Sequence, residues 1–350
     1  MEVAMTARNP APTLDDVARV AGVSRATVSR AVRGGHRVSA QAQQAIEAAI
    51  QELGYVPNQA ARSLALRRSN TIAVIVSEPH RRVFHDPFFS ISVAAVAERL
   101  EDTDQHMALY LSYGSFRRKL EEYLVGGHVD AVLVVSHHDE DQLPSLLERV
   151  GRPCVFLGRP AAQPREDGGF SVAERFVDVD NVAGGRAAGA HLVERGCRRI
   201  ATISGHMDIA SARERSTGFR AALADAGLEP VAVLHGNYDP DSGRTAALEL
   251  LNSGVEFDGL FVASDHMAAA ALAVLTENGV QVPGDVKLVG FDDAAISRVT
   301  TPALTTLTNP WRELAIAATE RILAEIDGTP PSGPLILQPE LIIRGSTGPA

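Results

Sequence analysis

The sequence predicts an N-terminal all-α helix-turn-helix head and an α/β body made of two doubly wound parallel sheets. Residues 13–32 have the spacing of two short helices joined by a tight turn. From Thr71 onward, apolar strand-like runs alternate with helical stretches, which is typical of parallel sheets covered by helices. Residues 1–70 hold nine arginines and five carboxylates, a net charge of +4; the whole chain carries −10, so the rest carries −14. A basic head on an acidic body predicts that only the head contacts phosphate.

Composition narrows the class of protein further. The 350 residues suffice for two or three domains, and 45% of them are hydrophobic and 22% charged. No apolar run approaches the ~20 residues that a membrane helix needs, and residues 1–12 lack the apolar core of a secretion signal. Cys154 and Cys197, the only cysteines, provide neither a disulfide framework nor a zinc cluster. We therefore expect a cytoplasmic protein with no membrane segment, and the sequence indicates no cofactor or metal.

The first two helices of the head have clear boundary signals. Thr13 is suited to cap the first helix, with Asp16 at the acidic position of a capping box. Gly22 can adopt the positive φ that ends a helix, and Ser24 can cap the second. A third helix is expected over 39–53, ended by Gly54.

The second helix has one apolar side and one polar side. Val28, Ala31 and Val32 form the apolar side, so the other positions face outward or toward the helix amino terminus. In a helix-turn-helix these outward positions meet base edges and phosphates, with arginine forks suited to guanine. An ordinary helical hairpin with a solvated basic face is the alternative interpretation. The DNA-contact candidates here are Ser24, Arg25, Ala26, Thr27, Ser29 and Arg30.

A short segment after the head has the pattern of a hinge. Pro57 fixes the chain, and Asn58 can cap a helix of only about two turns. Isolated helices shorter than ~12 residues are marginal in water, so this helix should order only when something holds it. Arg62 would add a phosphate contact beside it. Asn58 and Arg62 are therefore further DNA-binding candidates.

Five segments of the head and hinge together match a known family. They are Thr13-Leu-Asp-Asp-Val-Ala18, Ala21-Gly-Val-Ser24, Thr27-Val-Ser-Arg30, Leu53-Gly-Tyr-Val-Pro-Asn58 and Ala61-Arg-Ser-Leu64. In these segments the chain resembles the lactose/galactose repressor (LacI/GalR) family of bacterial transcription regulators. The resemblance implies that two hinge helices, one from each subunit of a homodimer, enter the minor groove together. It also implies that Leu64 wedges into the central base step; a packed hinge leucine is the alternative.

The resemblance also implies a domain organisation. Residues 12–56 would form the DNA-binding domain, 57–70 the hinge helix and linker, and 71–350 an effector-binding and dimerisation domain of the periplasmic-binding-protein type. Three crossings, near residues 172, 303 and 333, would divide that body. The first lobe would then hold about 71–172 and 304–332, and the second about 173–302 and 334–346.

Nine apolar runs are expected to be the strands of the body. Ligands of parallel sheets bind beyond the carboxyl ends of the strands, which directs attention to the residues that follow each run. The expected strands are Ile72–Val76, Met107–Leu111, Ala131–Val135, Cys154–Leu157, Phe176–Val179, Ile200–Ile203, Val231–Leu234, Leu260–Val262 and Lys287–Val289.

The residues at these strand ends suit a small polyhydroxylated effector. Aromatic rings can pack on its flat face while arginine and aspartate bind hydroxyls. By resemblance, Arg213 and Asp292 match the main ligand-contact positions and Tyr238 an aromatic stacking position. A sugar is favoured, with a purine or nucleoside next. The effector-binding candidates are Phe88, Phe89, Ser136, Arg159, Arg213, Tyr238, Ser264 and Asp292.

Several nearby residues have plainer interpretations. Asp265 is expected to cap a helix rather than touch a ligand, and Asp293 to solvate a loop. Trp311 either lines the mouth of the cleft or packs. The glycines of 184–189 fall within a helix pattern and lack the residues of a phosphate loop. Consecutive side chains of 137–141 point in different directions, so a solvated loop is expected there rather than a metal site.

The sequence as a whole predicts a ligand-responsive, homodimeric transcription factor, with a repressor favoured. Its DNA partner would be a pseudo-palindromic operator. The sequence leaves open whether the protein forms a tetramer, and whether the effector weakens or strengthens binding to DNA. A periplasmic binding protein and an enzyme with an accessory head are the rival classes. The basic head and the missing secretion signal disfavour the first, and no catalytic motif supports the second.

Overall fold

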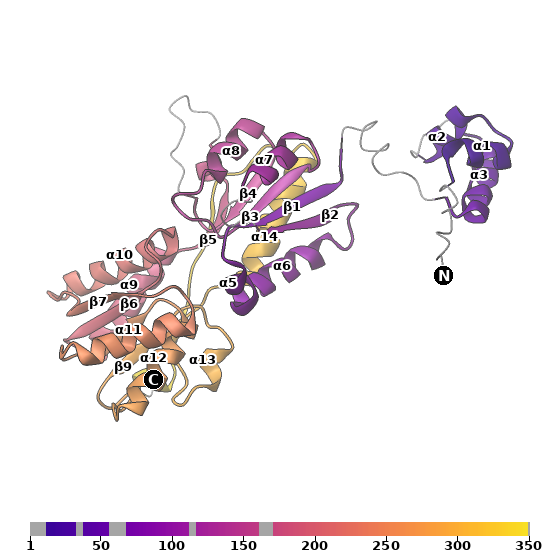
Figure 1. Cartoon of the computed structure of the whole chain (residues 1–350). Coiled ribbons are helices and arrows are strands. Elements are labelled where there is room, and N and C mark those ends of the chain that lie inside the picture. Colours follow the sequence, from indigo (N-terminus) through magenta and orange to yellow (C-terminus); the bar gives the residue numbers. More distant parts are fainter. Residues whose placement is uncertain (1–11, 33–37, 56–67, 112–116, 161–170, 349–350) are drawn as a thin grey trace, which may run out of the picture. The chain divides into compact units, whose positions relative to one another are not determined.

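The computed structural model describes residues 12–32, 38–55, 68–111, 117–160 and 171–348. The chain divides into two compact units, Met1–Asn70 and Thr71–Ala350. The first unit is helical, and the second contains parallel sheets covered by helices (Figure 1).

The first unit contains the three expected helices, α1 (Leu14–Ala21), α2 (Arg25–Val32) and α3 (Ala40–Leu53). They enclose a small core that includes Val17, Val28 and Ile46. The capping box of α1 is confirmed: Thr13 N donates to the Asp16 carboxylate at 3.0 Å, and Asp16 N donates to Thr13 Oγ1 at 3.3 Å. Hydrogen bonds from Thr13 lower the pKa of Asp16 to about 2.

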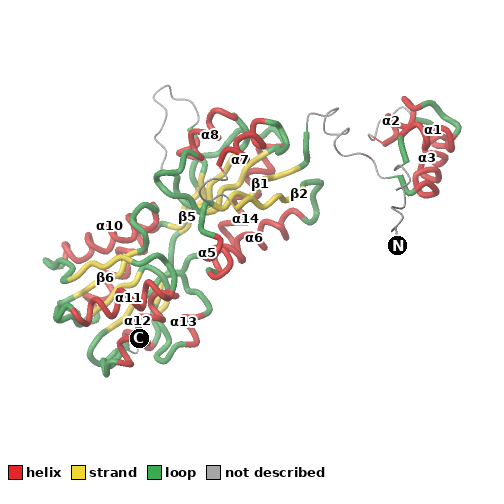
Figure 2. Tube along the Cα trace, viewed as in Figure 1, coloured by secondary structure: helices red, strands yellow, loops and turns green. Residues whose placement is uncertain are grey.

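The second unit begins with a six-stranded, all-parallel sheet. Its strand order is β11-β5-β4-β3-β1-β2, and every neighbouring pair runs parallel. Figure 2 shows its strands in yellow beside the red helices that cover them. The elements of this first lobe are β1 (Thr71–Val76), α5 (His80–His85), α6 (Pro87–Leu100), β2 (His106–Leu111), α7 (Arg117–Val125), β3 (Ala131–Val135), α8 (Leu143–Val150), β4 (Cys154–Leu157), the 3-10 turn Val172–Glu174, β5 (Phe176–Val179), α14 (Trp311–Ile326) and β11 (Leu335–Leu337).

Side-chain alternation along β1 explains why helices cover both faces of this sheet. Ile72, Val74 and Val76 pack with α6 and α14 on one face. Ala73 and Ile75 pack with α7 and α8 on the other. Strands buried on both faces are apolar throughout, as the sequence of this run is.

The second lobe repeats the plan with four parallel strands in the order β7-β6-β8-β9. Helices α11 and α12 pack on one face of this sheet, and α9 and α10 on the other. All nine expected strands of the body are therefore present. The elements are α9 (Asn181–Glu194), β6 (Ile200–Ser204), α10 (Ala210–Asp225), β7 (Ala232–His235), α11 (Pro240–Asn252), β8 (Gly259–Val262), α12 (Asp265–Glu277), β9 (Lys287–Val289), α13 (Ile296–Val299), the antiparallel pair β10 (Thr306–Leu307) and β12 (Leu341–Ile342), and the 3-10 turn Gly345–Thr347.

The three crossings between the lobes lie later in the chain than expected. Strand β5 pairs with β4 in the first sheet, so the first crossing follows Val179 rather than residue 172. Thr305 still bridges to β9, so the second crossing lies between Leu307 and Trp311, not near 303. Strand β11 pairs with β5, which moves the third from 333 to beyond Leu337. The expected lobe limits of about 71–172, 173–302, 304–332 and 334–346 were therefore wrong. The sequence of an apolar run does not reveal which of the two sheets it joins.

Helices α9 and α10 approach each other closely because glycines face their contact. A Cβ added at Gly218 would lie 1.9 Å from the backbone oxygen of Val182, and one at Gly185 would lie 2.0 Å from that of Arg215. The expectation that 184–189 is helical is confirmed, since these residues lie within α9. Their role is to let two backbones touch.

We expect Gly218→Ala to lower the free energy of unfolding of the body by at least ~1–3 kcal/mol, because the added methyl meets backbone that cannot move aside locally. Chemical denaturation of the purified protein measures this. The matched control is Gly333→Ala, where an added Cβ has no neighbour within 4 Å. Equal unfolding midpoints for the two variants would contradict the packing argument.

Candidate functional site

The outward side of α2 carries the DNA-contact residues expected from the sequence. Val28 and Ala31 are buried in the head core, while Arg25, Ala26 and Arg30 are exposed. Ser24 caps the helix as expected, because its Oγ accepts a hydrogen bond from Thr27 N at 3.1 Å.

The remaining polar residues of α2 lie at the edge of this exposed side. Thr27 and Ser29 are half-buried, and the Arg25 guanidinium lies 3.5 Å from the exposed Asp15 carboxylate. Asn58, Arg62 and Leu64 lie outside the described residues. The structure therefore leaves those three as expectations.

A cavity of about 110 Å³ lies between the two lobes of the body, at the carboxyl ends of both sheets. Parallel sheets bind ligands at this edge, where the connections that follow two neighbouring strands lead to opposite faces of the sheet. The structure brings six of the eight effector-binding candidates to its wall: Phe88, Ser136, Arg159, Tyr238, Ser264 and Asp292.

Arg213, which was expected to contact the ligand, is not among the residues that line the cavity, whereas Arg215, two positions later, is. Ser211 and Arg215 share one face of α10 and both line the cavity. Arg213 lies on a different face, where its guanidinium pairs with Asp139 of the first lobe, with Nη2 donating to Oδ1 at 3.0 Å. Residues 213 and 215 are separated by about 200° around the helix axis, so only one of them can face the cavity. The sequence analysis chose the wrong one of the two.

Arg215 is buried at the wall of the cavity, and its Nε and Nη1 both have polar partners. Its Nε donates to Asn181 Oδ1 at 2.8 Å, and its Nη1 donates to the Ala263 carbonyl at 2.6 Å. Nη1 also lies 3.4 Å from Asp292 Oδ1, and the guanidinium carbon lies 3.6 Å from the centre of the Phe291 ring. These contacts fix a positive charge against the cavity floor.

Two carboxylates of the cavity are unusually weak acids. Burial raises the pKa of Asp292 to about 6, even though Arg215 and Asn309 oppose the shift. Burial also raises the pKa of Asp178 to about 6, and the nearby Glu214 adds to the effect. Both carboxyls are ionised at neutral pH and can accept hydrogen bonds from hydroxyl groups.

Aromatic rings from both lobes form the walls. Phe88 packs edge-on against Trp311, with ring centres 5.7 Å apart, so Trp311 lines the cavity. Tyr238 of the second lobe faces Arg82 of the first, whose guanidinium carbon lies 5.2 Å from the ring centre. Phe89 does not line the cavity as expected, because its ring is buried in the core of the first lobe.

Three residues of the cavity wall hold a backbone conformation that L-residues rarely adopt. Ser136, Tyr238 and Asp292 have φ of +60°, +62° and +111°. Such strain costs roughly 1–3 kcal/mol per residue and concentrates at functional sites. Its coincidence with the cavity supports a binding role for this edge of the sheets.

Some cavity residues were missed by sequence reasoning. Arg82 and Asp86 follow β1 in a helical segment, and Asp178 lies within a strand where its apolar neighbours hide it. Asn309 and His266 also line the cavity. Only Asp86, as the cap before Pro87, had a visible signal in the sequence.

The sequence analysis assigned the wrong roles to Asp265 and Asp293. Ser264, not Asp265, caps α12, with Met267 N donating to Ser264 Oγ at 3.3 Å. Asp265 is fully buried and accepts from Thr306 Oγ1 at 2.7 Å; burial raises its pKa well above the ordinary value. Asp293 is not a loop-solvating carboxylate, because it pairs with Arg298 and Arg344.

Polar contacts hold the two lobes together at the rim of the cavity. Besides the Arg213–Asp139 pair, Arg159 lies 2.7 Å from Glu214. Asp139 N donates to the backbone oxygen of Asp208 at 3.0 Å. His138 Nδ1 lies 2.7 Å from Asp208 Oδ2, and contact with Glu78 followed by Asp208 raises the pKa of His138 to about 9. The lobes are therefore linked by charge pairs in this arrangement.

Comparisons with known proteins identify the class of this protein. Residues 13–58 match the family described as "Bacterial regulatory proteins, lacI family", and residues 190–347 match a periplasmic binding protein-like domain. The chain belongs to the lacI family of bacterial regulatory proteins: it is a DNA-binding transcriptional regulator and not an enzyme. In the described part of the chain, none of the helices is long and apolar enough to cross a membrane.

Particular relatives span nearly the whole chain. The transcriptional regulator CelR of Thermobifida fusca is 41% identical over 346 residues, covering 97% of this chain and 99% of the relative. GalR of Escherichia coli K12 is 33% identical over 95% of each chain. A CelR–cellobiose complex has a TM-score of 0.74 at 39% identity, covering 96% of this chain and 99% of the other. A lac repressor dimer bound to operator and an anti-inducer has a TM-score of 0.84 at 29% identity, covering 97% and 99%.

We expect Arg215→Met to lower the free energy of unfolding by ~3–5 kcal/mol, because it leaves a buried carboxylate without its cation. Arg213→Met is the matched control and removes a half-exposed pair, for which ~0–1 kcal/mol is expected. Urea denaturation of both proteins at neutral pH makes the comparison. A larger loss in the Arg213 variant would refute the placement of the two arginines.

Proposed function

We propose that this chain is a homodimeric repressor whose affinity for a pseudo-palindromic operator is controlled by a sugar bound between the lobes. Residues 12–56 would read the operator, 57–70 would form the hinge, and 71–350 would bind the effector and dimerise. The observation that carries the proposal is the cavity, in which aromatic rings and charged side chains from both lobes converge, among them the buried Arg215–Asp292 pair.

The chemistry of the cavity favours an uncharged polyhydroxylated ligand. Arginines and aspartates occur together there, so donors and acceptors for hydroxyl pairs lie close to each other. Trp311, Phe88 and Tyr238 offer apolar rings to the flat face of a sugar. Because one of the similar solved structures is a CelR–cellobiose complex, cellobiose is the first candidate effector. A purine or nucleoside is the second chemical class to test.

The exposed side of α2 would enter the major groove. Arg25 and Arg30 would reach guanine edges, Ala26 a thymine methyl, and Ser24, Thr27 and Ser29 would position the helix on phosphate. Two heads of a dimer would read the two halves of the operator. In the hinge, Asn58 would cap, Arg62 would contact phosphate and Leu64 would wedge into a base step.

The lobe contacts offer a way to couple the two sites. A ligand that binds one arrangement of the lobes more tightly shifts the population toward it. The rim pairs, among them Arg213–Asp139, break or form in that change, because each joins one lobe to the other. The altered body would change how the two hinges meet on DNA. Couplings of this kind are usually ~1–3 kcal/mol.

We expect cellobiose to bind the intact protein reversibly, one molecule per chain, and to change its affinity for operator DNA by roughly 5- to 150-fold. Calorimetry measures the binding, and fluorescence anisotropy with an operator selected from random DNA measures the coupling. A panel of other sugars and nucleosides is titrated in parallel. Tighter binding of a nucleoside than of any sugar would contradict the effector class.

Effector affinity should fall as the pH drops through about 6. The raised pKa of Asp292 means that its carboxylate is ionised at pH 7.5 but mostly protonated at pH 5, where it accepts fewer hydroxyl hydrogen bonds. Calorimetric titration at several pH values measures the effect. Asp292→Asn should bind more weakly at pH 7.5 and lose part of the pH dependence. An unchanged profile in that variant would exclude Asp292 as its source.

Base reading by Arg30 predicts a selective loss of affinity. Arg30→Ala should weaken binding to the selected operator by ~1–3 kcal/mol and binding to random DNA far less. Arg19→Ala is the control, since this exposed arginine lies on α1. Equal losses on operator and random DNA would show that Arg30 contacts only phosphate.

A further inference from the structure

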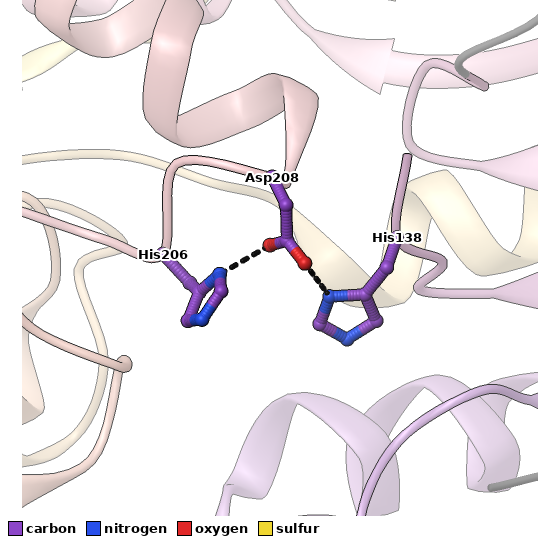
Figure 3. Close-up of side chains that lie close together, drawn as sticks. All are labelled: His138, His206 and Asp208. Carbon is purple, nitrogen blue, oxygen red and sulfur yellow. Dashed lines mark hydrogen bonds and ion pairs between the residues drawn. The ribbon is translucent and has the colours of Figure 1, made fainter. Parts of the chain in front are cut away.

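Three potential metal ligands from both lobes lie close together (Figure 3), next in the chain to the cavity-lining residues His137 and Ile209. His138 follows β3 in the first lobe, whereas His206 and Asp208 lie between β6 and α10 in the second. One nitrogen of each histidine and one oxygen of the aspartate all lie within 4.8 Å of one another. Figure 3 shows the carboxylate of Asp208 between the two imidazole rings, facing both.

The two histidine rings both direct Nδ1 toward the Asp208 carboxylate. His138 Nδ1 lies 2.7 Å from Asp208 Oδ2, and His206 Nδ1 is paired with Asp208 Oδ1. Both rings thus present the same type of nitrogen to one carboxylate. A divalent ion bound by these atoms would replace the Nδ1 protons that now face Asp208, and those protons would pass to solvent.

The buried Glu78 carboxylate lies close to the second ring nitrogen of His138 and favours one orientation of the ring. Glu78 is 1% exposed, and its Oε1 lies 3.3 Å from His138 Nε2. Arg82 and Ser136 donate to the same Glu78 oxygen at 2.7 and 2.6 Å, so the carboxylate is fixed. Metal-binding histidines usually have a carboxylate or carbonyl at their second nitrogen, which fixes the ring and makes it a stronger ligand.

One hydrogen bond fixes the loop of His138 internally, and a backbone hydrogen bond joins this loop to that of Asp208. His138 N donates to Asp141 Oδ2 at 3.0 Å, and Asp139 N donates to the Asp208 carbonyl at 3.0 Å. The side chains of His138, Asp208 and His206 are 20%, 30% and 52% exposed, which leaves a path for an ion from solvent. The ligands are therefore ordered but accessible.

We propose that His138, His206 and Asp208 form a binding site for a divalent transition-metal ion of the zinc type, which ties the two lobes together. Two imidazole nitrogens favour zinc and its neighbours over magnesium or calcium, which prefer all-oxygen sites. Three protein ligands leave one position of a tetrahedral ion for water. The site adjoins the effector cavity but does not depend on the identity of the effector.

Titration of the intact, untagged protein with zinc chloride at pH 7.5 tests the site. We expect one zinc ion per chain and a zinc-dependent rise in the midpoint of thermal unfolding. Cobalt in place of zinc should give the visible absorption bands of a four-coordinate ion. His206→Gln and Asp208→Asn should each weaken zinc binding by at least about tenfold. Both side chains are partly exposed, so these variants should remain folded, which circular dichroism checks.

The control is His128→Gln, which replaces an exposed histidine that stacks on Tyr123 in the first lobe. Its zinc affinity should equal that of the wild type. Zinc binding that survives unchanged in the His206 and Asp208 variants would overturn the proposal, since the ion would then bind elsewhere. Absence of binding by the wild type at millimolar zinc would overturn it too, and would leave the three residues as an ion-pair contact between the lobes.

Discussion

The hydrogen bonds and ion pair of the buried Arg215 guanidinium are the interactions on which the cavity between the lobes depends. They join the start of α9 through Asn181, the end of β8 through the Ala263 carbonyl, and the segment after β9 through Asp292. A buried charge costs several kcal/mol unless it is paired and hydrogen-bonded, so these partners are required and not optional. The floor of the cavity is therefore set by the second lobe alone, before any ligand arrives.

The close contact of α9 and α10 makes that placement possible. Gly185 lies directly against the backbone of Arg215, so the two helices approach until the guanidinium can reach Asn181. The walls contributed by the first lobe are held differently, through charge pairs such as Arg159–Glu214 that span the rim. One half of the cavity is thus held by hydrogen bonds and an ion pair within the second lobe, and charge pairs join the first lobe to it.

Local patterns in the sequence predicted most of the fold, whereas the site depended on information that is not local. The capping box of Thr13 and the apolar run that forms β1 are decided by neighbouring residues, and both were predicted correctly. The choice between Arg213 and Arg215 depends on which face of α10 meets the second sheet, which the sequence does not state. The grouping of His138 with a histidine 68 residues later likewise exists only because two strand ends meet across the lobes.

The three crossings give the body a covalent architecture in which neither lobe is a continuous piece of chain. Strand β11 and helix α14 belong to the first lobe but come after nearly all of the second, while β12 returns to the second. A single stretch of chain therefore contains one complete lobe only if it also contains part of the other. The head is joined to the body by a single stretch of chain, so recognition of DNA and recognition of metabolites can be recombined as separate modules during evolution.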